Sequence, residues 1–166
     1  DKKALENIFK KIYRNKAIHF EFTSGDVSSD KNVNLSNVET KVYEYVDRYR
    51  KDKKLSKKDI SQVVHIFDMD GAYIDDSYIK KSDDDGFIYS EEGIECSDVN
   101  RVIIRNSHKR EIMDYLLSRV TIKGIPYRCF YFSCNLDHAL YNKPNLNENE
   151  KMKYANAFYE SFIGKE

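Results

Sequence analysis

The sequence predicts an α/β fold in which one domain, residues 1–166, has a mostly parallel sheet flanked by helices. Its 166 residues are 40% hydrophobic, which is enough apolar material for one core. Amphipathic helical segments alternate with short apolar strands along the chain, the order typical of parallel sheets. The apolar run at 63–67 ends in Asp68 and Asp70, as strands do when the carboxyl end of a sheet carries a ligand site.

In the first third of the chain, the apolar residues alternate between helical spacing and strand spacing. Apolar residues at helical spacing predict a helix over 2–14, and alternation predicts a strand over 17–22. A polar loop follows at 23–35. Ser36-Asn37-Val38-Glu39 is a capping box, so we expect a helix to begin there. The stretch 50–58 is a basic, solvated connector to the apolar strand at 63–68.

The remaining residues predict a less regular stretch and then further helices and strands. Residues 71–106 lack clear periodicity and are rich in acidic residues, so we expect an insertion of loops and short strands. The elements expected after it are a helix over 108–120, a turn at 124–126, a strand over 127–132, a short helix over 135–141, and a last helix capped by Asn147 and Glu150.

Composition narrows the classes of function. The chain has 28 basic and 28 acidic side chains, so nucleic-acid binding would need a local patch. Its three cysteines, Cys96, Cys129 and Cys134, are odd in number and lack CxxC spacing, which argues against a disulfide framework or a zinc ribbon. No stretch has the length of a membrane span and no signal-peptide pattern is present, so we expect a cytoplasmic protein without membrane contact.

Asp68 and Asp70 are the candidate metal ligands. Alternate residues of an extended chain point the same way, so both carboxylates could reach one hard cation, most plausibly Mg²⁺. A bound cation would also offset the cost of two acids beside an apolar strand. The alternative is a turn that ends the strand, with aspartate as a turn or capping residue.

A second acidic strand end follows the predicted strand at 127–132. Ser133 and Cys134 lead there into Asp137 and His138. Because parallel strands present their carboxyl ends at one edge, the two strand ends could converge on one crevice. Asp137 would add a carboxylate, and His138 an imidazole suited to proton transfer near neutral pH, which makes both candidate catalytic residues.

The two acidic strand ends in this element order resemble the Toprim (topoisomerase–primase) fold, and within it the RloB-like family. Asp68 and Asp70 match the Asp-x-Asp metal pair of that family, and the stretch Ser133–His138 resembles its later strand end, with Asp137 at the acidic position. The resemblance implies Mg²⁺-dependent action on nucleic acid or nucleotides and a place in bacterial restriction or phage defence. It also implies that a catalytic glutamate either lies upstream of Asp1 or has been lost.

Three other interpretations remain open. Without the glutamate, the resemblance implies a non-catalytic binding or scaffold module that associates with an ATPase or another defence-system subunit. The string at 67–71 also resembles the haloacid-dehalogenase phosphatase signature, with 130–133 as its second motif, although only 33 residues remain for the later motifs. Residues 81–92 have the glycine and acidic spacing of a calcium loop, but Lys81 occupies its first position.

Two smaller candidates lie elsewhere. The cluster 106–110, at the expected start of a helix, could hold a phosphate through backbone N–H groups and cations, although an ordinary helix entry with a solvated basic face is the stronger interpretation. Cys134, next to the predicted site, is a candidate nucleophile with no partner geometry implied by spacing.

Overall fold

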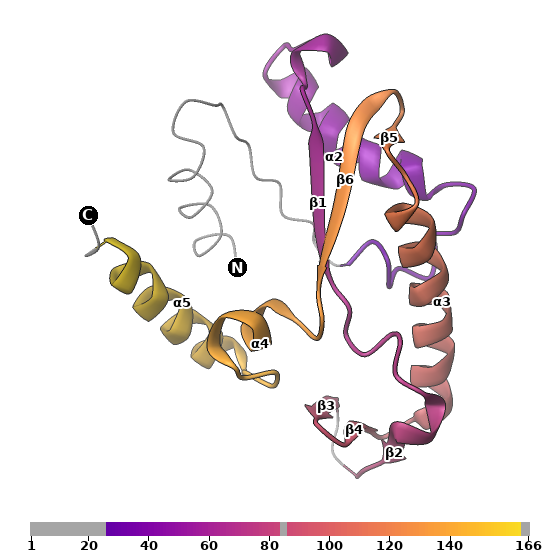
Figure 1. The fold of residues 1–166 in the computed structure, drawn as a ribbon, viewed down its shortest axis with the longest axis vertical. Helices are drawn as coiled ribbons and strands as arrows, with labels where there is room; N and C mark the ends of the chain where they lie inside the picture. Colours follow the sequence, from indigo (N-terminus) through magenta and orange to yellow (C-terminus); the bar gives the residue numbers. More distant parts are fainter. Residues whose placement is uncertain (1–25, 84–85, 164–166) are drawn as a thin grey trace. The chain divides into compact units, whose positions relative to one another are not determined.

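The computed structural model describes residues 26–83 and 86–163 (Figure 1). These residues are α/β, as the sequence predicts, and form two compact units that divide between Asn135 and Leu136. The predicted helix over 2–14 and strand over 17–22 lie outside the described residues.

The central feature of the first unit is the parallel pairing of two strands. β1 (Val63–Asp68) pairs along its whole length with β6 (Ile125–Phe132), and the register places Val63 opposite Tyr127 and Asp68 opposite Phe132. Pairing continues beyond both strands, because Met69 N donates to Phe132 O at 3.0 Å and Asp70 N donates to Cys134 O at 2.8 Å. The predicted strands and their parallel relation are confirmed, and both carboxyl ends lie at one edge (Figure 1).

A short antiparallel strand, β5 (Thr121–Ile122), completes this sheet in the order β1-β6-β5. Lys123 and Gly124 form the turn between β5 and β6, with φ values of 48° and 81°. Positive φ at both turn residues is the signature of a type I′ hairpin. The sequence predicts a turn at 124–126 and no strand before it, because two residues are too few to show alternation.

The stretch after β1 forms a second, smaller sheet. After the 3₁₀ turn η2 (Asp76–Tyr78), β2 (Ile79–Lys81), β4 (Gly93–Cys96) and β3 (Phe87–Ser90) are ordered β2-β4-β3, with β2 and β4 parallel and β3 and β4 antiparallel. β2 ends at the first position of the proposed calcium loop and β4 begins directly after its last, so the described residues on either side do not form the helical flanks of an EF-hand.

The long helix α3 (Val99–Leu117) begins earlier than the predicted residue 108 and ends before residue 120. Asp98 caps it by accepting a hydrogen bond of 3.0 Å from Arg101 N. The buried residues ahead of Ile112 include Asn106 and Lys109, which interrupt the apolar stripe. Hydrophobic periodicity therefore reveals only the second half of this helix.

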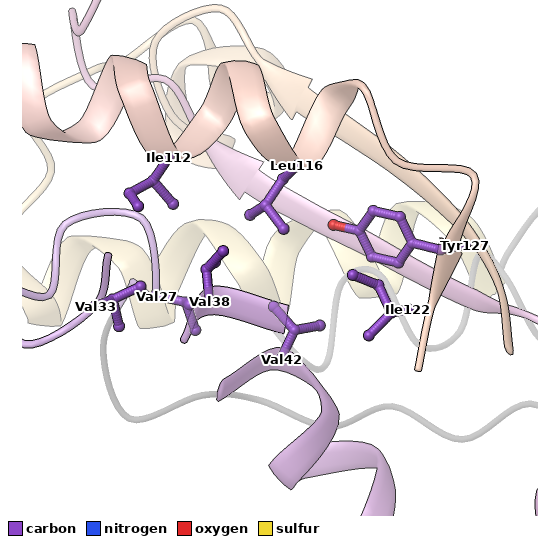
Figure 2. Close-up of a cluster of buried hydrophobic side chains, with 8 residues drawn as sticks. All are labelled: Val27, Val33, Val38, Val42, Ile112, Leu116, Ile122 and Tyr127. Atoms are coloured by element: carbon purple, nitrogen blue, oxygen red, sulfur yellow. The ribbon is translucent and has the colours of Figure 1, made fainter. Parts of the chain in front are cut away.

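The main core lies between α3, α2 (Val38–Asp52) and the inner face of β6. Figure 2 shows Val38 and Val42 of α2 near Ile112 and Leu116 of α3, with Tyr127 and Ile122 at one end of the cluster. The predicted helix is confirmed, but its capping box is not formed. Asn37 occupies the cap position of α2, and Ser36 Oγ donates to Asn34 Oδ1 at 2.6 Å instead.

The described residues cover only one face of the β1–β6 pair. Val63 and Phe67 pack into cores on the covered face, together with Tyr127. On the other face Val64 is 49% exposed and Phe130 is 51% exposed. The prediction of a sheet covered on both faces is therefore met on one face within the described part of the chain.

The second unit contains two helices, α4 (Leu136–Tyr141) and α5 (Glu148–Ile163). The predicted cap of the last helix is confirmed, because Asn147 N donates to Glu150 Oε2 and Glu150 N donates to Asn147 Oδ1, both at 3.0 Å. Tyr141 packs against Tyr154 and Phe158 with ring centroids 5.4 and 6.0 Å apart. None of the helices in the described ranges combines the length and apolar character needed to cross a bilayer.

His65 on β1 makes the stability of the fold sensitive to acid. Its Nδ1 shares a hydrogen bond of 2.8 Å with the Tyr127 hydroxyl, and burial lowers the pKa of His65 to about 4, although the charge of Asp26 opposes the shift. His65 is therefore harder to protonate in the folded state than in the unfolded chain, where its pKa is about 6.5. We expect the free energy of unfolding to fall by about 2 kcal/mol between about pH 7 and pH 5.

Urea denaturation at both pH values measures this change. His65→Gln should be destabilised at neutral pH and should lose most of the dependence between pH 7 and pH 5. An unchanged pH dependence in the variant would assign the acid sensitivity to another group.

Candidate functional site

Asp68 and Asp70 lie at the carboxyl end of β1, where the sequence analysis places them, but in different backbone conformations. Asp68 is the last residue of the strand and lies in register with Phe132. Asp70 and Gly71 follow with φ values of 48° and 70°, in the left-handed region. The chain therefore turns at Asp70, and the alternation that was expected to point both carboxylates the same way does not extend to this residue.

Lys109 of α3 holds the carboxylate of Asp70. Its side chain has no exposed area, and its Nζ lies 2.7 Å from Asp70 Oδ2 and forms a second ion pair with Asp26 Oδ2. A buried ammonium without such partners would be very costly. The two acids thus compensate one cation, and they join β1, α3 and the segment around Asp26.

Asp26 is held by a local network as well as by Lys109. Ser28 donates to its carboxylate through the backbone N at 2.8 Å and through Oγ at 2.7 Å, and Ser29 Oγ donates at 2.9 Å. Burial tends to raise the pKa of Asp26, but the charge of Lys109 and the hydrogen bonds from Lys109 and Ser28 outweigh it and lower the pKa overall. Asp26 therefore stays ionised opposite Lys109.

Two further side chains of α3 hold the turn itself. Arg105 Nη2 donates to Asp70 O at 2.7 Å, and Asn106 Nδ2 donates to Gly71 O at 3.1 Å. The interpretation of 106–110 as a helix entry, with phosphate-binding N–H groups or a solvated face, is wrong. These residues lie inside α3, and Asn106 and Lys109 are fully buried.

Cys134 lies at the same edge as the two acids. Burial raises the pKa of its thiol, and the negative charges of Asp70 and Asp68 raise it further. A raised pKa disfavours the thiolate, so the environment does not activate Cys134 as a nucleophile. The backbone N of Asp70 donates to the Cys134 carbonyl at 2.8 Å, so the turn after β1 and the residues after β6 lie side by side.

One oxygen of Asp70 remains available in this arrangement. Oδ2 faces Lys109, whereas Oδ1 accepts no hydrogen bond from the described residues. Within 26–83 and 86–163, no three His, Cys, Asp or Glu side chains are grouped so that they could hold a metal ion by themselves. A cation bound at Asp68 and Asp70 would therefore need water or a phosphate oxygen to complete its ligands.

Asp137 and His138 lie in the second unit, at the start of α4. Asp137 is 7% exposed, and burial raises its pKa while Lys151 Nζ, 3.9 Å from Oδ2, opposes the rise. The carbonyl of His138 accepts a hydrogen bond of 2.9 Å from Asn142 N. The predicted catalytic roles of both residues stay predictions.

No protein-family model matches this chain, and no curated protein or solved structure is significantly similar to it.

Removal of the Lys109 charge should destabilise the protein strongly. Lys109→Met keeps most of the side-chain volume but leaves Asp26 and Asp70 without their shared cation. We expect a loss of about 3–5 kcal/mol in the free energy of unfolding, the usual cost of breaking a buried ion pair.

Urea denaturation at neutral pH gives this value. Lys80→Met is the matched control, because Lys80 is exposed and its pair with Glu92, at 3.2 Å, should contribute little. Equal losses in the two variants would contradict a central role for Lys109.

Proposed function

We propose that Asp68 and Asp70 bind a divalent cation, Mg²⁺, and that the chain is a Toprim-like, RloB-like domain acting on a phosphodiester or a nucleotide. The observation that carries the proposal is that the acidic end of β1 lies beside the end of the parallel strand β6, where Asp70 N donates to Cys134 O. This edge is where open α/β sheets bind their ligands. A cytoplasmic role in bacterial restriction or phage defence is part of the proposal.

Two carboxylate ligands fit magnesium better than they fit a cation that takes all of its ligands from the protein. Mg²⁺ usually takes one or two carboxylates and completes its shell with water and substrate phosphate oxygens. Asp70 can keep Oδ2 on Lys109 and offer Oδ1. When bound, the cation would polarise a phosphate oxygen.

The neighbouring side chains supply the positioning that such a site needs. Lys109 fixes the carboxylate of Asp70, and Arg105 and Asn106 fix the carbonyls of Asp70 and Gly71. Lys109 also offsets one negative charge, which reduces repulsion between the acids before a cation arrives. A carboxylate held in this way loses little freedom when it binds an ion.

A non-catalytic binding module is the second candidate. The ion pair of Asp70 with Lys109 favours it, because an ammonium already occupies one oxygen of a proposed ligand. Metal binding without turnover of oligonucleotides or nucleotides, together with stable association with a partner subunit, would select this function over an enzyme.

Metal titration tests the site assignment. Asp68→Asn and Asp70→Asn should each weaken Mg²⁺ binding by at least about tenfold, because each removes an anionic ligand from a site with few protein donors. Isothermal titration calorimetry on the full chain measures the affinity. Glu111→Gln is the matched control, because Glu111 is an exposed acid on α3.

Thermal denaturation of each variant shows whether it is folded under the titration conditions. Wild-type affinity in both aspartate variants would remove the assignment to Asp68 and Asp70. Loss of affinity in Glu111→Gln as well would point to nonspecific binding by surface acids.

A further inference from the structure

We propose that Arg105, supported by the ring of Phe87, is a phosphate-binding group beside the cation site. Its ligand would be a phosphate of a nucleic-acid strand or of a free nucleotide. The inference rests on the proposed function for its substrate class, but its geometry is independent of any cation. Arg105 contacts Asp70 through the backbone carbonyl and so lies next to the predicted ligand.

All the hydrogen-bond acceptors of Arg105 among the described residues are neutral. Nη2 donates to Asp70 O at 2.7 Å, Nε donates to Asn106 Oδ1 at 3.0 Å, and Nη1 contacts the hydroxyl of Tyr89 at 3.5 Å. Arg50 differs, because its Nη2 lies 2.7 Å from a carboxylate oxygen of Asp47. The positive charge of Arg105 therefore has no carboxylate partner in the described part of the chain.

The guanidinium also has donor capacity left. It carries five N–H groups, two of them on Nη1. The single contact of Nη1 with Tyr89 is long, so Nη1 can donate to a phosphate oxygen while Nε and Nη2 keep their contacts. A hydrogen bond between a guanidinium and a phosphate is charge-assisted and stronger than the contact it would replace.

Arg105 is held in place before any ligand arrives. The Cζ atom lies 4.8 Å from the centroid of the Phe87 ring, and the amide of Asn106 that accepts from Nε is buried. A side chain ordered in advance loses less entropy on binding. Phe87 is itself 40% exposed, so its ring also reaches solvent, where a base could stack.

The charges around Arg105 explain how it would work with a cation. Among the groups in contact here, Asp26 and Asp70 carry two negative charges, and Lys109 and Arg105 carry two positive charges. A divalent cation would make this set of groups net positive and so favour an anionic substrate. The contribution of Arg105 itself should persist when the cation is removed.

Fluorescence anisotropy with a short, labelled thymidine oligonucleotide tests the inference on the full chain. We expect Arg105→Gln to weaken binding by about tenfold in EDTA and in Ca²⁺, because one charge-assisted phosphate contact is lost. The slope of log K against log salt should become shallower by about 0.7, the value for one phosphate on a single strand. Arg101→Gln is the matched control, because Arg101 is exposed on the same helix.

Two further variants separate charge from folding. Phe87→Leu leaves the hydrogen bonds of Arg105 in place and should weaken binding less than Arg105→Gln, whereas Arg105→Lys keeps the charge but loses the planar donor geometry. Competition with thymidine monophosphate distinguishes the two possible sources of the phosphate. Displacement of the oligonucleotide assigns the site to the phosphate of a free nucleotide, and failure to displace it assigns the site to the backbone of a strand.

Equal binding by wild type and Arg105→Gln would overturn the inference, as would an equal loss in Arg101→Gln or no oligonucleotide binding by the wild type. An Arg105 effect in EDTA combined with wild-type Mg²⁺ affinity in the aspartate variants would overturn the cation site alone. The two proposals therefore fail separately.

Discussion

The buried ammonium of Lys109 is the constraint on which the rest of the first unit depends. It has no exposed area, so the structure is stable only if anionic partners accompany it into the interior. Asp26 and Asp70 supply that compensation from positions 83 and 39 residues away along the chain. One side chain of α3 thereby joins the segment around Asp26 to the turn that follows β1.

Different parts of α3 have different roles. Ile112, Met113 and Leu116 contribute to the cores, whereas the polar side chains at 105, 106 and 109 contact the turn after β1. Arg105 binds the carbonyl of Asp70 and Lys109 binds its carboxylate. The two proposed binding groups, for a cation and for a phosphate, are thus linked mechanically through a single residue.

Local signals in the sequence predict much of the fold but only part of the site. The apolar run of β1 and the cap formed by Asn147 and Glu150 are short-range features, and both are confirmed. The start of α3 was missed because buried polar residues break its apolar periodicity. The acids Asp68 and Asp70 are visible as a strand ending, but their partners Asp26, Arg105 and Lys109 come from distant segments, and pairing across such separations leaves no periodic trace in one sequence. The one available hint of these contacts was that a lysine and an asparagine interrupt the apolar face of a helix.

The parallel pairing of β1 with β6 also has a consequence for the newly made chain. The two strands meet in a register that joins Val63 to Tyr127, so the apolar strand β1 leaves the ribosome long before its neighbour exists. At the usual rates of synthesis the interval is on the order of 3–10 s. During this time β1 presents unpaired backbone groups and apolar side chains, while the β5–β6 hairpin needs only adjacent residues and can form as it emerges. Chaperone demand during translation should accordingly be concentrated on the segment that later carries the acidic strand end.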